Sequence, residues 1–288
     1  MTLEIGILFA IVSMLSWGTA DFFAKKVIDK IGYATTLVFN LSVSLGPILV
    51  FAVLFSKIPA ITTGFVSITV AAGVLGITGY IFLYRGFQKG KVSLVSPISA
   101  SWAVITTLLA VFLFKEELTL LQIIGIVVVF VGVFLTSTNL AELKKSIKHV
   151  RYNGVMDGII SMIAWGIAYA LIKPVVAIAG PIMALFLLRV VATTTLFSWV
   201  GLSKTRISLS TKLAFLFLVI VSALDTLGFA TYNVGITTEF VSIVGPVAAT
   251  YPAVTIVLAY LFLKERMASN QKIGIVAILA GLALISLV

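Results

Sequence analysis

The chain has 288 residues, of which 61% are hydrophobic and only 10% are charged, and its formal net charge is +10. A soluble domain carries roughly 25% charged residues, so this composition lacks the polar surface of a water-soluble globule and excludes that class. The basic residues occupy short gaps between apolar runs, which is typical of loops that face anionic lipid headgroups and not of a nucleic-acid surface.

Apolar runs of about 20 residues, the length of a helix that crosses a bilayer, follow one another along the chain. They predict ten transmembrane helices, so we expect an all-α, multi-pass protein of the cell membrane. Five spans fall in residues 1–138 and five in 154–288, and the basic stretch 139–153 links the two halves. The expected spans are 4–23, 34–55, 63–84, 92–114, 118–138, 154–172, 181–202, 211–234, 241–263 and 269–288.

The second half of the chain repeats the first. Residues 92–132 recur at 241–281 with a constant offset of 149 residues and without a gap. Such self-similarity in an apolar chain indicates the internal repeats of a transporter. Because each half holds an odd number of spans, the second half enters the membrane from the opposite side, which predicts two inverted five-helix repeats. The identical pairs include Val92/Val241, Ser93/Ser242, Pro97/Pro246, Lys115/Lys264, Glu116/Glu265, Gln122/Gln271, Gly125/Gly274 and Gly132/Gly281.

The orientation of the chain can be inferred from its basic residues. The loops on one side hold sixteen Lys and Arg residues, whereas the opposite side, which carries both termini, holds only Lys57, Lys115 and Lys173. Because cytoplasmic loops are rich in Lys and Arg, this count predicts that both termini face outward.

The paired motifs resemble the EamA-type branch of the drug/metabolite transporter superfamily. They are Trp17-Gly18, the Val-Ser-x-Val-x-Pro that begins at Val92, the Lys115-Glu116 pair, and Gln-x-x-Gly followed by a second Gly in the fifth span. The resemblance implies a ten-helix transporter with a central cavity between its halves, moving small organic metabolites or drugs, often outward. It also implies cytoplasmic termini, against the charge count, so the orientation stays open.

Two charged residues lie deep within predicted spans, where a charge is expensive and therefore functional by default. Arg189 lies in the seventh span and Asp225 midway along the eighth, and the equivalent residues of the first half are Asn40 and Gly76. The two are interpreted either as a substrate-facing pair or as a proton-coupling carboxylate, Asp225, beside its counter-ion. The alternatives are a structural ion pair or an arginine that extends to the membrane interface.

A further carboxylate, Asp21, lies near the end of the first span and four residues before Lys25, on the same helical face. For it we favour an end-of-helix salt bridge over a contact with substrate. Glu116 and Glu265, at helix ends, are expected to bind loops or helix termini.

Aromatic residues deep in the spans are expected to line the cavity and to offer ring faces to apolar or cationic substrates. Ordinary helix packing is the alternative. Pro97 and Pro246 lack a backbone donor and are expected to kink or to start their helices. The expected cavity residues are Trp17, Tyr80, Trp102, Trp165, Tyr169, Arg189, Asp225, Tyr232 and Tyr251.

The sequence carries no enzyme or cofactor signal. The stretch GFQKGK at 86–91 is one residue short of a phosphate-binding loop and is followed by Val, so neither ATP nor another cofactor is expected. The single histidine, His149, and the lack of cysteine indicate no metal site. We therefore expect no enzyme but a secondary transporter, with a small-molecule substrate and the bilayer as partners, and a monomer is compatible with this. A lipid or lipid-linked-sugar flippase and a non-transporting scaffold subunit are the alternatives.

Overall fold

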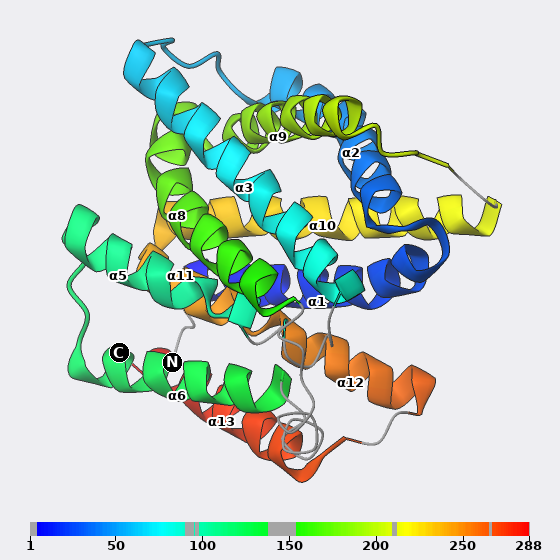
Figure 1. Cartoon of the computed structure of the whole chain (residues 1–288). Coiled ribbons are helices and arrows are strands. Elements are labelled where there is room, and N and C mark those ends of the chain that lie inside the picture. The colour runs from blue at the N-terminus through cyan, green and yellow to red at the C-terminus, as the bar shows by residue number, and fades with distance from the viewer. Residues whose placement is uncertain are drawn as a thin grey trace.

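The computed structural model describes residues 5–89, 95, 98–137, 154–208, 212–264 and 267–287. Within these ranges the regular structure is entirely helical, as predicted (Figure 1). The predicted linker 139–153 and Pro97 lie outside the described residues. The helices are α1 (Ile5–Ile31), α2 (Tyr33–Phe55), α3 (Thr63–Lys89), α5 (Trp102–Phe114), α6 (Leu120–Ser137), α8 (Val155–Ala179), α9 (Pro181–Ser203), α10 (Lys212–Thr238), α11 (Val241–Ala248), α12 (Tyr251–Leu263) and α13 (Ser269–Ile285).

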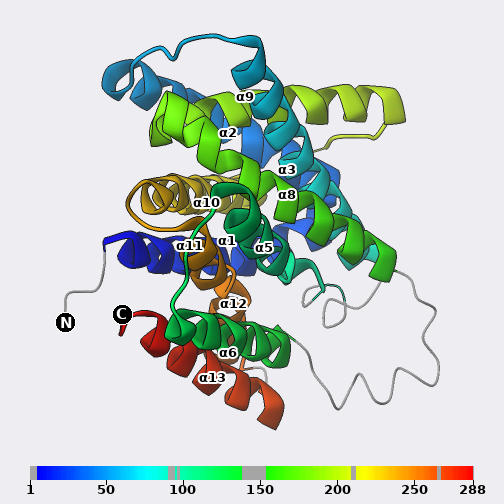
Figure 2. The ribbon, with the colours of Figure 1, turned by 90° about the vertical axis from the view of Figure 1, so that its left-hand side faces the viewer.

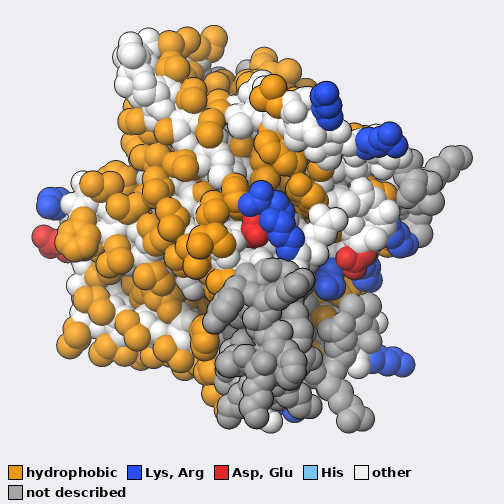
Figure 3. Space-filling view, in the orientation of Figure 1, with side chains coloured by type: hydrophobic (Ala, Val, Ile, Leu, Met, Phe, Trp, Pro, Cys, Tyr) orange, Lys and Arg blue, Asp and Glu red, His pale blue; other side chains and the backbone are white. Residues whose placement is uncertain are grey.

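Seven helical segments in the described ranges are long and apolar enough to cross a membrane, with α11 and α12 counted together as one. Three shorter apolar helices of 10–17 residues accompany them, namely Ile98–Phe114, Leu120–Thr136 and Ser269–Ile285. Figure 3 shows a broad hydrophobic surface on one face of the molecule. A surface of this kind is suited to lipid and not to water, so the chain is a multi-pass integral membrane protein.

The start of α1 and the end of α13 lie near each other on one side of the molecule (Figures 1 and 2). Most Lys and Arg side chains on the visible face lie toward the opposite side (Figure 3). On this face the basic side chains and the ends of the chain therefore lie toward opposite sides of the molecule.

The two halves turn at equivalent positions. Gly32 joins α1 to α2 with φ 79°, and Gly180 joins α8 to α9 with φ 75°, a left-handed region that glycine enters without strain. Lys115 and Lys264 both end their helices in the left-handed conformation, with φ of 57° and 56°. The repeat seen in the sequence is therefore also a repeat of backbone geometry.

The ninth predicted span is broken. α11 runs through Pro246 and ends at Ala248, and α12 begins at Tyr251 with Thr250 as its N-cap. Ser101, the equivalent of Thr250, is the N-cap of α5 and has nearly the same backbone angles. Both halves thus interrupt this helix at one shared position, and Pro246 lies one turn before the break and not at it.

The halves contact each other reciprocally through glycines of α6 and α13. A Cβ atom on Gly281 would lie 2.7 Å from the carbonyl oxygen of Gly125, and one on Gly274 would lie 2.7 Å from that of Gly132. Since Gly125 is equivalent to Gly274 and Gly132 to Gly281, exchanging the halves turns one contact into the other. The two equivalent helices are therefore antiparallel, and only glycine lets their backbones approach so closely.

A second reciprocal contact joins the longer helices. Trp165 of α8 packs its indole ring against Gly79 of α3, and Trp17 of α1 packs its ring against Gly228 of α10. These four residues form two repeat-equivalent pairs, and each pair crosses from one half to the other. The two halves are thus interleaved about a pseudo-two-fold axis.

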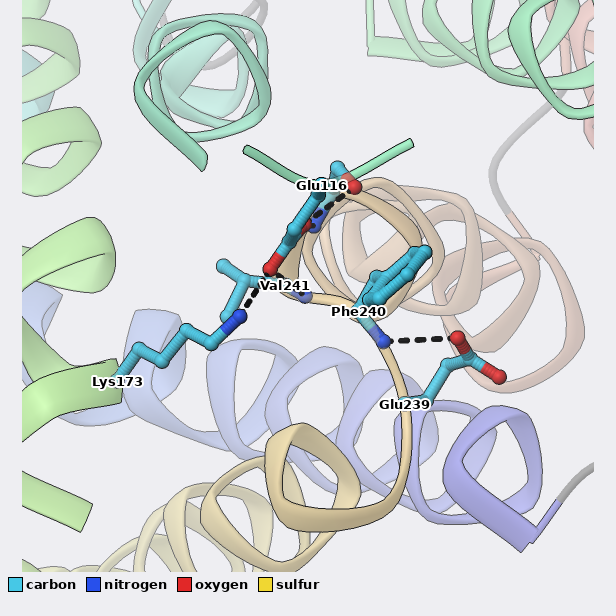
Figure 4. Close-up of polar contacts among 6 residues, drawn as sticks. Glu116, Lys173, Glu239, Phe240 and Val241 are labelled. Atoms are coloured by element: carbon cyan, nitrogen blue, oxygen red, sulfur yellow. Dashed lines mark hydrogen bonds and ion pairs between the residues drawn. The ribbon is translucent and has the colours of Figure 1, made fainter. Parts of the chain in front are cut away.

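Glu116, between α5 and α6, ties the first half to the second (Figure 4). Its carboxylate accepts hydrogen bonds from the backbone N–H groups of Val241 (3.1 Å) and Ser242 (2.9 Å) and from the Ser242 hydroxyl (2.5 Å). Lys173 of α8 lies 2.5 Å from it. The N-terminus of α11 has N–H groups without intrahelical partners, and a carboxylate placed there satisfies them. The expected role of Glu116 is confirmed, whereas Glu265 lies outside the described residues.

The surroundings of Glu116 determine its protonation. Burial raises the pKa of its carboxyl, but the hydrogen bonds from Lys173 and Ser242 and the nearby Lys173 charge outweigh burial, so its pKa lies below the ordinary value of 4.5. A group with a lowered pKa stabilises the fold at pH values above its ordinary pKa, and this contribution is lost as the pH falls through the lowered pKa.

We expect Glu116→Gln to lower the free energy of unfolding by about 2 kcal/mol at pH 7, because charge-assisted hydrogen bonds are each worth about 1.5–3 kcal/mol. Thermal unfolding of the purified protein measures this difference, which should shrink below pH ~4.5 as wild-type Glu116 protonates. Glu117→Gln, at the exposed neighbouring residue, is the control and should change little. A difference that does not depend on pH would contradict the role of the charge.

Candidate functional site

A cavity with about 530 Å³ of empty space, partly open to the surroundings, lies between the two halves. Helices α2 and α3 of the first half and α8, α9 and α10 of the second supply its walls. Most of the lining is apolar. The lining residues used below are Leu41, Gly73, Gly76, Tyr80, Trp165, Tyr169, Arg189 and Phe229.

The position of this cavity follows from a difference between the repeats. Gly76 lines it, and a Cβ atom on Gly76 would meet no other atom within 4 Å. The equivalent residue of the second half is Asp225, which is 3% exposed and surrounded by partners. The space that Asp225 fills in one half is therefore open beside Gly76 in the other.

Asp225 is the centre of a buried polar cluster. Arg189 lies 2.9 Å from its Oδ2 atom, and the Tyr80 hydroxyl donates to its Oδ1 atom at 2.8 Å. The Asn40 side chain donates to Oδ2 at 3.4 Å. Asn40 of α2 and Arg189 of α9 occupy equivalent positions in the two repeats. One carboxylate therefore accepts hydrogen bonds from the same position of both halves.

Arg189 connects this cluster to the cavity. Its side chain is buried, its guanidinium carbon lies 5.2 Å from the centre of the Phe229 ring, and it belongs to the cavity lining. Asp225 is not among the lining residues. In this structure the ion pair between Arg189 and Asp225 is formed. The guanidinium lies between the carboxylate and the Phe229 ring, at the wall of the cavity.

A second cavity, with about 290 Å³ of empty space, adjoins the first. The rings of Tyr80, Trp165 and Tyr169 belong to the walls of both cavities. The other residues that line the second cavity are Trp17, Asp21, Trp102 and Tyr251. Apart from Asp21, the described residues of this lining are all aromatic.

The predicted cavity residues fall into three groups in the structure. Tyr80, Trp165 and Tyr169 separate the two cavities, Arg189 lines the first, and Trp17, Trp102 and Tyr251 line the second. Asp225 lies behind Arg189 and Tyr80. Tyr232 is fully buried, lines neither of these cavities, and packs edge-on against Tyr169 at 5.1 Å between ring centres.

Asp21 differs from the expectation. Among the described residues it forms no ion pair with Lys25 or any other cation, and it lines the second cavity. Helical spacing places Lys25 on the same face, but this lysine is exposed and its ammonium group stays in solvent. The salt bridge proposed from the i, i+4 spacing is therefore wrong in this structure.

Two contributors to the site were visible in the sequence but not used. Asn40 and Gly76 are the repeat equivalents of Arg189 and Asp225. The sequence identifies them only as positions where the two halves differ. That difference could have predicted the cavity. A position with a small residue in one half and a charged residue in the other marks where the symmetric packing fails.

Comparisons with known proteins agree with this architecture. A family model described as the EamA-like transporter family matches residues 4–138 and 153–287. A crystal structure with 12% sequence identity superimposes with a TM-score of 0.80 and covers 99% of both chains. At that identity the likeness shows a shared fold and nothing more.

Two curated relatives match parts of the chain. An uncharacterized protein of Methanocaldococcus jannaschii is 34% identical over 137 residues, which make up 47% of this chain and 98% of that protein. That relative is about as long as one repeat. A putative sugar uptake protein of Listeria innocua is 32% identical over 170 residues, which make up 57% of this chain and 55% of that protein. The present chain thus spans about half the length of the Listeria relative.

The family match covers both repeats and confirms the resemblance drawn from the paired motifs. It points to a transporter and away from an enzyme. The chain, a multi-pass protein of the cell membrane, belongs to the EamA-like transporter family.

Proposed function

We propose that the protein is a secondary active transporter that exports small organic solutes by alternating access. The observation that carries this proposal is the cavity of about 530 Å³ whose walls come from both repeats. A solute held there contacts both halves, so rocking of one half against the other changes the side to which the solute is exposed. The partners that the proposal requires are the solute and the bilayer, and a monomer is sufficient.

Inverted threading of the two halves supports alternating access. Equivalent helices α6 and α13 run antiparallel and share reciprocal glycine contacts. In a protein built from two such halves, each half can adopt the conformation of the other. This exchange opens the cavity to one side of the membrane and closes it to the opposite side. With the three shorter helices included, we propose ten membrane crossings, which require both ends of the chain to lie on one side; the neighbouring positions of the start of α1 and the end of α13 support this (Figure 2).

The basic side of the molecule supports one orientation. On the face drawn in Figure 3, most Lys and Arg side chains lie toward the side away from the start of α1 and the end of α13, and the positive-inside rule assigns that side to the cytoplasm. In this orientation the termini face outward, which we adopt over the family expectation.

Asp225 is our choice for proton coupling. It is buried, and its hydrogen-bond partners are Arg189, Tyr80 and Asn40. A proton added to Asp225 neutralises the carboxylate and breaks its charge balance with Arg189. The guanidinium that lines the cavity is then free to bind elsewhere, so protonation and the state of the cavity are linked. A purely structural ion pair between Arg189 and Asp225 would have the same geometry. Transport experiments distinguish a structural role from proton coupling.

We expect Gly76→Leu to reduce transport at least tenfold while leaving thermal stability near that of the wild type, because the new side chain enters open space in the cavity. The solute is selected beforehand by a thermal-shift screen of amino acids, sugars, nucleosides and cationic drugs. Flux into proteoliposomes then measures the effect. Gly46→Leu is a matched control, since Gly46 also lies inside a helix with no atom near its absent Cβ. Equal flux in the wild type and Gly76→Leu would remove this cavity from the pathway.

Asp225→Asn should abolish accumulation driven by a pH gradient and leave solute exchange at equal pH measurable. The amide keeps the shape of the side chain but does not take up the coupled proton. Because Arg189 loses its counter-ion, a stability loss of about 3–5 kcal/mol is also expected, so transport is normalised to folded protein. Asp157→Asn, which removes an ion pair with Arg85 at a helix end, controls for general loss of charge. Unchanged gradient-driven accumulation in Asp225→Asn would eliminate the coupling role.

A further inference from the structure

We propose that the second cavity binds the ammonium headgroup of an organic cation, with Asp21 as its counter-ion and aromatic rings as its walls. This inference rests on the proposed transport function and names a substrate class for it. It is carried by three features of the described residues, namely an unpaired carboxylate, the charge balance around it and the arrangement of the rings.

The carboxylate of Asp21 is the first feature. It lines the cavity, and no hydrogen bond or ion pair joins it to another described residue. The more deeply buried carboxylates are satisfied, since Asp225, Asp157 and Glu116 each contact at least one cationic side chain. An ionised carboxylate inside a membrane protein needs a partner, and here the part of the chain that the structure describes supplies none. A ligand cation is the group that completes the site.

The charge balance is the second feature. Among the described residues, no Lys or Arg lines the second cavity. Arg189, which lines the first cavity, is neutralised by Asp225 at 2.9 Å. Asp21 is therefore the one carboxylate in the described lining of both cavities, and it has no cationic partner there. A negative site in a low-dielectric region attracts a cation and repels an anion.

The rings supply the third feature. Trp17 and Tyr251 stand nearly perpendicular, with 6.4 Å between ring centres and 83° between planes, and Trp17 meets Tyr169 at 5.7 Å and 68°. Rings set at right angles form the corner of a box in which ring faces can surround a small group. A cation over an aromatic face gains about 0.5–2 kcal/mol, and aromatic boxes with a nearby carboxylate suit quaternary ammonium groups.

The polar groups of the cavity argue against a sugar as its occupant. Apart from Asp21, the polar side chains among its described lining residues are those of Trp and Tyr. Recognition of a sugar requires several convergent donors and acceptors, whereas an alkylated ammonium group requires charge and ring faces.

Titration of the purified full chain in lipid nanodiscs with phenyltrimethylammonium tests the proposal. Three of the four tryptophans, Trp17, Trp102 and Trp165, line the cavity, so tryptophan fluorescence reports on its occupancy. We expect the wild type to bind this cation at least tenfold more tightly than tert-butylbenzene, the neutral molecule of the same shape. Asp21→Asn should weaken cation binding at least tenfold and leave the neutral molecule unaffected, and Asp21→Glu should restore part of the loss.

Asp29→Asn is the matched control. Asp29 lies two turns further along α1, is exposed, and lines neither cavity, so this variant should bind like the wild type. Equal affinity for the charged and neutral molecules, or unchanged cation binding in Asp21→Asn, would overturn the proposal.

Flux measurements on the same preparations keep this test apart from that of the proposed function. Transport of a neutral solute through a protein that fails to bind the cation would refute the Asp21 site and leave the transporter intact. Cation binding that depends on Asp21, without flux of any solute across the membrane, would support the site and refute transport.

Discussion

A carboxylate buried inside a membrane protein must find its partners within the protein, and Asp225 finds them in both halves of this chain. Arg189 comes from the second repeat, and Tyr80 and Asn40 come from the first. The cluster therefore joins the halves at their seam and fixes the position of a guanidinium at the wall of the larger cavity. The cavity, the aromatic wall beside it and the proposed coupling all depend on this arrangement.

Symmetric packing and its interruption divide the molecule into two kinds of region. Glycines at equivalent positions of α6 and α13, and tryptophans that pack against glycines on α3 and α10, repeat the same contacts across the pseudo-two-fold axis. In lipid the hydrophobic effect does not drive helices together, so close backbone approach through small residues is a main source of their attraction. At the position where the second repeat has Asp225, the first repeat has Gly76. There the symmetry fails, and space is left beside Gly76. The filled regions hold the fold, and the open one is available for function.

Sequence reasoning identified what depends on local pattern and repetition. The helical class, the two repeats and the role of Glu116 at a helix terminus followed from apolar length, a fixed offset and a carboxylate next to a helix end. The facing of side chains did not follow, because most faces of these helices are apolar and the hydrophobic period that reveals orientation in soluble helices is weak. Tyr232, for that reason, could not be told apart from Tyr251.

Some features required three-dimensional packing to be visible. Asp21 and Lys25 have the spacing of a salt bridge, and only the position of the cavity shows that the carboxylate faces inward. The helix break at Ser101 and Thr250 lies beyond the prolines that suggested it, and nothing in the residue types of that position marks it.

Opposite threading of the two repeats is the central claim, and the natural absence of cysteine makes it directly measurable. Lys57, between α2 and α3, and Arg206, between α9 and α10, are repeat-equivalent residues outside the helices. Single variants Lys57→Cys and Arg206→Cys can be treated in intact cells with a membrane-impermeant maleimide. The account predicts labelling of Lys57→Cys from outside and protection of Arg206→Cys until the membrane is opened. Labelling of both from the same side would contradict it.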